Sequence, residues 1–459
     1  MDLIPLRRSA RGAAGFDPSR VHLLPRGDAS VLVIDRITGR WVMLPVERLP
    51  MLRLLATPSA ALGDGPLRRS VGALRSLLSE RGIGHAPRHA HDRLNTVILK
   101  LTKACNLACS YCYDYEQGER ARHMDPDTGR RAVREAVELA TGTLHFILHG
   151  GEPMLAWELV EALVEEAHRA AAGRDLEVRF IGQTNLTRLD SRIVGFSLEH
   201  DLQWGISLDG PPSLNDRFRI AHDGSGSYAR FMACLERFPE FTRRCGVMTT
   251  VTSVTADRLP EIAHHFRELG MPAWDWTLFQ PIGRGRDDSC FRYDPDRLCQ
   301  SWDELFDAVE AGELDGFAVK PVLKYLDNFL DGPVSNMCMR SQCGAARDLL
   351  SVSHDGTVEA CDCIDPLGAR GGLGTLQRDG LAGARASQKA DLIRSREVER
   401  LRCGECLWQG VCGGTCLAHA GGVDRVWDDA CALSLLAFDR ISESLARSDR
   451  LLRYRESCA

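Results

Sequence analysis

The sequence predicts an α/β protein built around an open (β/α)6 partial barrel, with a small unit of strands and helices before it and a cysteine-rich segment after it. Two observations support this prediction. From Asn95 onward, short apolar strands alternate with helical patterns six times, which is typical of βαβ units in a parallel sheet. Most of the cysteines beyond this point gather in three groups, at 105–112, 338–363 and 403–431.

The six strands of the barrel are short apolar runs separated by amphipathic segments. The strands are predicted at Thr96–Leu101, Leu144–His149, Leu176–Gly182, Gln203–Leu208, Gly246–Thr252 and Trp274–Phe279. Helices are predicted between them at about 126–140, 155–172, 187–199, 226–238 and 257–269. Right-handed crossovers can curl such a sheet into a partial barrel, and ligands bind at the carboxyl ends of its strands.

Three flanking regions complete the predicted organisation, besides the barrel at 91–283. Residues 1–90 are predicted to form a winged-helix-like module, with strands at Val21–Leu24, Ser30–Asp35 and Trp41–Pro45 before helices at Val46–Leu55 and Leu67–Arg81. A helical linker follows the barrel at 284–335. Residues 336–459 show little hydrophobic periodicity before a final helix at roughly 431–451, so metal clusters are expected to order this segment.

Composition narrows the class of protein. The 459 residues carry a formal net charge of −6, which gives no basic excess for binding nucleic acid. No apolar run is long enough to span a membrane, and the N-terminus lacks a secretory signal, so a cytoplasmic protein is expected. In a reducing compartment the 17 cysteines are better explained as metal ligands than as disulfides.

The first cysteine group directly follows the first barrel strand. Cys105, Cys109 and Cys112 are spaced so that three and then two residues separate them. Three thiolates can hold three irons of a [4Fe–4S] cluster and leave the fourth iron open. A zinc knuckle or three unrelated core cysteines are the alternatives, but zinc sites usually take four ligands and no fourth Cys or His lies close in sequence.

This motif, with the aromatic Tyr111 before its last cysteine, resembles the radical S-adenosylmethionine (SAM) superfamily. The resemblance implies a partial TIM barrel in which the open iron binds SAM. One electron then cleaves SAM to a 5′-deoxyadenosyl radical, which takes a hydrogen atom from the substrate. The resemblance also implies that Tyr111 lies near the SAM adenine.

Further segments at strand ends resemble the SAM-binding segments of that family. Gly150, Gly151, Glu152 and Pro153 would contact the methionine amino group, although the stretch could also be a simple strand-to-helix turn. The resemblance assigns ribose and carboxylate contacts to Gln183, Asn185, Ser207, Asp209 and Arg219. Arg219 could instead form a surface ion pair, which would contribute little.

The later cysteines resemble the SPASM domain, a C-terminal extension of radical SAM enzymes that modify peptides and proteins. The resemblance implies an inner [4Fe–4S] cluster on Cys338, Cys343, Cys361 and Cys416, and an outer one on Cys403, Cys406, Cys412 and Cys431. Cys363 is a second candidate for the place of Cys361, and a pair of structural zinc sites is the alternative for the region. Asp362 is expected to act as a base, or to hydrogen-bond around the cluster.

The N-terminal module resembles leader-recognition domains of enzymes that mature ribosomally made peptides. It would add a leader peptide to its sheet as a strand, unless it is only a capping domain. We therefore expect a radical SAM/SPASM maturase that forms an oxidative C–C or C–S crosslink in a precursor peptide, with flavodoxin or ferredoxin as reductant. The alternatives are a sulfatase-maturing, formylglycine-forming enzyme and a non-catalytic iron–sulfur or zinc protein.

Overall fold

The computed structural model describes residues 4–5, 16–85, 93–114, 122–286, 288–332, 338–340, 343–362 and 372–459. Within them, ten strands form one large sheet in the order β11-β10-β9-β8-β7-β6-β5-β12-β13-β14. Its centre is six parallel strands in sequence order: β5 (Leu94–Thr102), β6 (Ala140–Gly150), β7 (Leu176–Thr184), β8 (Gln203–Ser207), β9 (Gly246–Val251) and β10 (Ala273–Leu278). All six strands predicted from the sequence are therefore confirmed.

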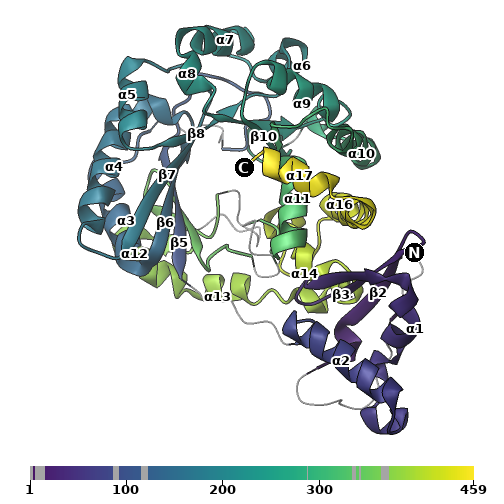
Figure 1. The fold of residues 1–459 in the computed structure, drawn as a ribbon. Coiled ribbons are helices and arrows are strands. Elements are labelled where there is room, and N and C mark those ends of the chain that lie inside the picture. The colour runs from purple at the N-terminus through teal and green to yellow at the C-terminus, as the bar shows by residue number, and fades with distance from the viewer. Residues whose placement is uncertain are drawn as a thin grey trace.

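The sheet curves into an open barrel with helices on its outer side (Figure 1). The helices between the six strands are α3 (Pro126–Leu139), α4 (Trp157–Ala171), α5 (Ser191–Glu199), α6 (Pro212–Phe218), α7 (Tyr228–Arg237), α8 (Pro239–Thr242) and α9 (Leu259–Glu268). Strand β5 is buried along almost its whole length, as expected for a parallel strand covered on both faces. The carboxyl ends of the strands meet at one edge, where the polar loops lie.

The sheet continues beyond the six strands on both sides. After α10 (Pro295–Ala311), the short strand β11 (Ala318–Val319) pairs with β10, and α11 (Lys320–Asp331) follows it. On the other side β12 (Leu349–Val352) runs parallel to β5, and β13 (Thr357–Glu359) and β14 (Gly374–Thr375) pair antiparallel beyond it.

Despite the low hydrophobic periodicity of residues 336–459, this segment has an apolar core, so metal clusters are not needed as its only source of order. Leu350, Val358, Leu376 and Ile393 are buried in the same core as the barrel strands. Strand β12 supplies this core because its backbone pairs with β5, a contact that no local periodicity reveals. The remaining elements are the helices α12 (Leu376–Arg385), α13 (Gln388–Arg394), α14 (Gln409–Cys412), α15 (Leu417–Ala420), α16 (Asp428–Arg447) and α17 (Arg450–Ser457).

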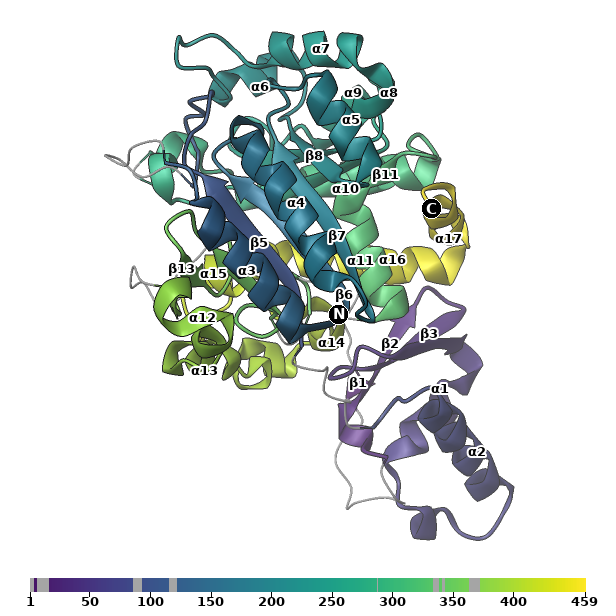
Figure 2. The same ribbon diagram turned by 90° about the vertical axis from the view of Figure 1, so that its left-hand side faces the viewer.

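The N-terminal unit is a four-stranded antiparallel sheet in the order β1 (Ile4–Pro5), β2 (Val21–Arg26), β3 (Ser30–Asp35) and β4 (Trp41–Pro45), with the helices α1 (Leu49–Leu52) and α2 (Pro66–Glu80). It lies below α11 and α16 (Figure 2). Alternate residues of its strands face two different neighbours. One face, including Val31 and Val33, packs on its own helices, and the other, including Leu32 and Ile34, packs on the main core.

No helix in the described part of the chain is long and apolar enough to cross a bilayer.

Candidate active site

The loop of Cys105, Cys109 and Cys112 lies at the carboxyl end of β5 and is fixed by backbone hydrogen bonds. Ala108 N–H donates to the Ile220 carbonyl at 2.7 Å, and Ser110 N–H donates to the Phe218 carbonyl at 2.9 Å. Burial raises the pKa of Cys105 to about 12 and that of Cys109 to about 11, and neighbouring thiols add to both rises. Three cysteines brought close together in one fixed loop suit an iron–sulfur cluster, whose cations would hold the ligands as thiolates.

The glycine stretch after β6 packs directly on the strand end that precedes Cys105. Gly151 N–H donates to the Thr102 carbonyl at 2.6 Å. A Cβ on Gly151 would lie 2.2 Å from the Ala104 carbonyl oxygen, and one on Gly150, whose φ is +117°, would lie 2.4 Å from that of Thr102. Only glycine allows this approach, so the stretch is more than a simple turn.

Glu152 joins the ends of β6 and β7. Its buried carboxylate accepts hydrogen bonds from Met154 N–H at 3.1 Å, Thr184 Oγ1 at 2.7 Å and Asn185 N–H at 2.8 Å. Pro153 then begins a short 3-10 turn and is buried. Glu152 therefore supports the local backbone through its side chain.

Three other predicted residues lie at the ends of neighbouring strands. The Asn185 amide donates to Asn106 Oδ1 at 3.0 Å and approaches Cys105 Sγ at 3.8 Å. Gln183 is the next-to-last residue of β7, and its buried Oε1 accepts from no donor among the described residues. Ser207 is the last residue of β8. An unpaired buried amide oxygen near the end of a strand fits a site that binds a polar ligand.

Tyr111, Asp209 and Arg219 form one buried unit. Tyr111 OH donates to Asp209 Oδ2 at 2.5 Å, and Arg219 Nε lies 3.0 Å from the same oxygen. The guanidinium also lies 5.5 Å from the Tyr111 ring centroid. Arg219 is only 8% exposed, so the expectation of a surface ion pair is wrong.

Residues 283–285 form another wall of the first cysteine loop. The sequence predicts the end of the barrel and the start of a linker here, and the residues form a short 3-10 turn against this loop. Arg284 Nη1 donates to the Cys109 carbonyl at 2.8 Å, and Arg284 N–H donates to that of Cys112 at 2.9 Å. A Cβ on Gly283 would lie 2.4 Å from the Cys112 carbonyl oxygen. The Gly-Arg-Gly sequence was the signal for this contact.

The later cysteines lie near one another in two groups. In the inner set, burial raises the pKa of Cys361 well above its usual value, and the charges of Cys338, Cys343 and Cys416 add to this effect. In the outer set, burial raises the pKa of Cys403 to about 11, and Cys412, Cys406 and Cys431 add to it. The four outer cysteines line one pocket.

The two cysteine sets suit iron–sulfur clusters in number and donor chemistry, because four thiols converge in each. No three His, Cys, Asp or Glu side chains of the described residues are grouped closely enough to hold a single metal ion. Cys363, the alternative to Cys361, lies outside the residues that the structure describes.

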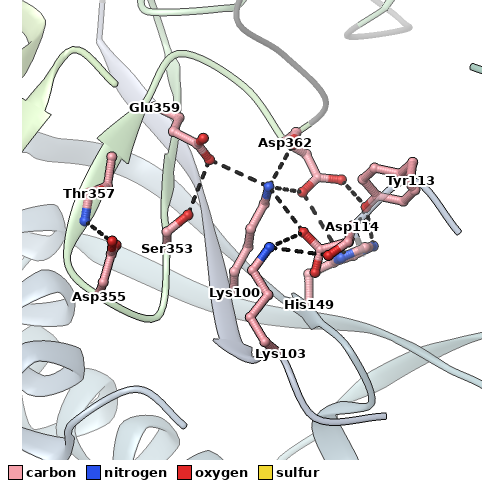
Figure 3. Close-up of polar contacts among 10 residues, drawn as sticks. All are labelled: Lys100, Lys103, Tyr113, Asp114, His149, Ser353, Asp355, Thr357, Glu359 and Asp362. Carbon is pink, nitrogen blue, oxygen red and sulfur yellow. Dashed lines mark hydrogen bonds and ion pairs between the residues drawn. The ribbon is translucent and has the colours of Figure 1, made fainter. Parts of the chain in front are cut away.

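Asp362 reaches from the inner set into the barrel, where it meets residues of β5, β6 and the first cysteine loop (Figure 3). Tyr113 OH donates to Asp362 Oδ2 at 2.6 Å, and Lys100 Nζ lies 3.5 Å from Oδ1 and donates to the Asp362 carbonyl at 2.7 Å. His149 Nδ1 lies 4.0 Å from Oδ1. Burial by itself would raise the pKa of Asp362, but His149, Lys100 and the Tyr113 hydrogen bond lower it to about 2.

Sequence reasoning missed Lys100, Tyr113 and His149. Lys100 also pairs with Glu359 Oε2 at 3.4 Å and Asp114 Oδ1 at 3.6 Å, so one ammonium joins three carboxylates. Its signal was available, because a lysine within an otherwise apolar and buried strand needs charged partners. The partners themselves come from distant segments and could not be identified from the sequence.

The radical SAM superfamily profile matches residues 99–266, which run from β5 to α9 and include the first cysteine loop. These residues form a radical SAM domain. The domain marks the chain as an enzyme, so a non-catalytic binding protein is no longer an alternative. This radical SAM enzyme is 25% identical over 337 residues to a cysteine-type anaerobic sulfatase-maturating enzyme of Clostridium perfringens, with 70% of this chain and 88% of that protein covered.

Two solved structures are similar to the radical SAM enzyme in fold. The structure of anSMEcpe with bound AdoMet has a TM-score of 0.67 at 22% identity, covering 77% of this chain and 98% of that chain. The structure of Streptococcus suis SuiB bound to its precursor peptide SuiA has a TM-score of 0.54 at 13% identity, covering 90% of this chain and 98% of that chain. These matches extend the similarity in fold beyond the barrel.

Proposed function

We propose that this radical SAM enzyme is a maturase that oxidises a ribosomally made precursor peptide and holds three [4Fe–4S] clusters. One cluster would bind to Cys105, Cys109 and Cys112 and leave an iron for SAM, and the inner and outer sets would each hold another. The observation that carries the proposal is the place of Asp362. It follows an inner-set cysteine and lies within hydrogen-bond reach of Tyr113, next to Cys112.

The predicted SAM contacts form the second part of the proposal. We assign the methionine group to the backbone of the stretch Gly150–Pro153 and the ribose and carboxylate to Gln183, Asn185 and Ser207 at the neighbouring strand ends. Asp209 and Arg219 would also contact the ribose and carboxylate, and Tyr111, which donates a hydrogen bond to Asp209, would lie near the adenine. When bound, SAM and its cluster supply the one-electron chemistry that removes a hydrogen atom from the substrate.

Asp362 would then remove a proton. After loss of a hydrogen atom, the substrate must still lose one proton and one electron to form the new bond, so a base and an electron acceptor are both needed. Asp362 is ionised at neutral pH because Lys100 and Tyr113 stabilise its carboxylate. Its neighbour Cys361 belongs to the inner set, which would accept the electron. Both steps would occur side by side, which suits an oxidative crosslink.

The substrate class is inferred from the N-terminal unit and the relatives. The strands β1–β4 with α1 and α2 suit a winged-helix-like module that binds a leader peptide, and SuiB, which shares the fold, is seen with a precursor peptide. We infer that a flavodoxin or ferredoxin supplies electrons. We also place the enzyme in the cytoplasm, where its many thiols stay reduced.

The test starts with anaerobic reconstitution using iron, sulfide, dithionite and SAM. We expect 5′-deoxyadenosine and about twelve irons per chain, because each cluster has four. Co-expression with a short open reading frame beside the gene should change the peptide mass by about −2 Da, since the oxidation removes two hydrogens. An unchanged peptide mass despite SAM cleavage would contradict the crosslink and indicate epimerisation. Two zinc ions in place of the auxiliary iron would contradict the cluster assignment.

Formylglycine formation is the second candidate, and the 25% identity to a sulfatase-maturating enzyme over 70% of this chain favours it. The same network serves this reaction, since it also removes a hydrogen atom, a proton and an electron. A peptide with the sulfatase recognition motif separates the candidates. Conversion of its cysteine to an aldehyde, detected by a hydrazide probe, would favour this second candidate over the crosslink.

A further inference from the structure

The turn between β3 and β4 lies against the loop that carries the outer set. A Cβ on Gly39 would lie 2.8 Å from the backbone carbon and oxygen of Gly410, and one on Gly410 would lie 2.1 Å from the Gly39 nitrogen. Backbone meets backbone here, with no room for a side chain. Gly410 lies between the outer ligands Cys406 and Cys412. The N-terminal unit therefore contacts the segment that would hold the outer cluster.

Arg36, in the same turn, extends this contact to the first pair of outer cysteines. Its Nη1 donates to the carbonyl of Gly404, which lies between Cys403 and Cys406. The same Nη1 donates to Gln409 Oε1 at 3.3 Å. The guanidinium therefore supports the backbone before Cys406 and the side chain of Gln409 after it.

The turn is held rigidly by a buried carboxylate. Asp35 is fully buried and accepts hydrogen bonds at Oδ1 from Ile37 N–H at 2.9 Å and Thr38 N–H at 3.1 Å. Its Oδ2 accepts from Gly84 N–H at 2.8 Å and lies 3.2 Å from Arg20 Nη2. The turn is thus set by the N-terminal unit before it meets the cysteine loop.

Further contacts fix the N-terminal unit on the main body around this point. Arg26 pairs with Asp439 of α16 at 2.5 Å, and its guanidinium lies 5.9 Å from the ring centroid of Trp408 in the outer pocket. Trp41 Nε1 donates to the Phe329 carbonyl at 2.5 Å. These contacts lie on the sheet face that packs on the main core, so the N-terminal sheet has a fixed position on the main body.

We propose that the β3–β4 turn is part of the outer metal site, with Arg36 as a positioning residue that fixes the loop of Cys403 and Cys406 and stabilises negative charge on its cluster. The proposal rests on the outer cluster of the proposed function. Reduction adds an electron to a cluster, and a nearby cation stabilises the reduced state. Removal of the cation therefore lowers the reduction potential of the outer cluster, while the inner cluster keeps its own.

The test compares matched variants of the full, reconstituted chain. Arg36→Gln is paired with Arg40→Gln, which removes the same charge from the same turn. The native Arg40 guanidinium donates to the Arg81 carbonyl and not to the cysteine loop. Gly39→Ala is paired with Gly27→Ala in the β2–β3 turn. The two glycines have similar φ values of +70° and +60°, but a Cβ on Gly27 meets nothing within 4 Å. Both alanines thus carry similar backbone strain, and only Gly39→Ala pushes against the cysteine loop.

The readouts are EPR-monitored reduction potentials, iron content and hydrogen exchange of residues 403–412. The outer signal is identified as the one that Cys431→Ser removes. We expect a lower outer potential in Arg36→Gln than in Arg40→Gln, and lower iron with faster exchange in Gly39→Ala than in Gly27→Ala. The iron loss should approach one cluster, about four atoms.

Equal potentials in the two arginine variants, together with equal iron and exchange in the two glycine variants, would overturn the proposal. The glycine variants are compared by hydrogen exchange as well as by iron content. The proposal therefore stays testable even if Arg36→Gln folds poorly. A wild-type chain with only about eight irons has no outer cluster, and that result would overturn the cluster assignment itself before any variant is compared.

Discussion

Asp362→Asn separates proton removal from SAM cleavage. The asparagine keeps the size of the side chain and can still accept the Tyr113 hydrogen bond, which is 2.6 Å long in the native protein. Lys100 loses one carboxylate but keeps Glu359 at 3.4 Å and Asp114 at 3.6 Å, as well as the main-chain carbonyl of residue 362. The variant should therefore fold and keep its clusters.

The size of the effect follows from the role of the carboxylate. An amide cannot take up a proton at neutral pH, so the whole contribution of the base is lost. Such a contribution is about 10²–10⁴-fold in rate, or about 3–5 kcal/mol in the activation barrier. The hydrogen-atom step does not use Asp362, so formation of 5′-deoxyadenosine should change by less than about threefold, or about 0.7 kcal/mol.

The assay measures peptide product and 5′-deoxyadenosine in the same anaerobic reaction. The matched control is Glu359→Gln, which removes a carboxylate from the same lysine but lies farther along the network, beside Ser353. We expect Asp362→Asn to cleave SAM with little product, and Glu359→Gln to keep most of its product. Equal product in both variants, or an Asp362→Asn rate within threefold of wild type, would refute the role of Asp362 as base.

Three further predictions concern the cysteine loops. Glu152→Gln replaces a carboxylate that accepts three hydrogen bonds, so it should lower the free energy of unfolding by about 1.5–3 kcal/mol in chemical denaturation. The control Glu158→Gln, at an exposed position, should change this free energy by less than about 0.5 kcal/mol. Cys416→Ser should lower the iron content by about four atoms per chain, whereas Cys458→Ser should not, and equal iron in both would contradict the inner set. Gly151→Ala should weaken SAM binding by at least tenfold in equilibrium dialysis because its Cβ would displace the segment before Cys105, and unchanged affinity would show that this close approach is not needed.

The sequence by itself determined the barrel and the first cysteine loop. Both depend on short-range information. Each of these patterns lies within a few residues: the apolar run of a strand, the spacing of apolar residues in a helix, and the interval between Cys105 and Cys112. The backbone follows such patterns locally. The partition of eight later cysteines into two sets is implied by a resemblance and stays a prediction, although thiols within each set influence one another electrostatically.

Only the tertiary structure decided which distant segments meet. Strand β12 joins β5 through backbone hydrogen bonds that any sequence could form, so composition gave no sign of it. Asp362 meets Tyr113 across 249 residues and Lys100 across 262, and Arg36 meets Gly404 across 368. A charged residue in the sequence shows that it needs a partner, but packing of the whole chain selects that partner. The cysteine spacing therefore predicted the type of chemistry, while the fold determined which residues surround the cysteines.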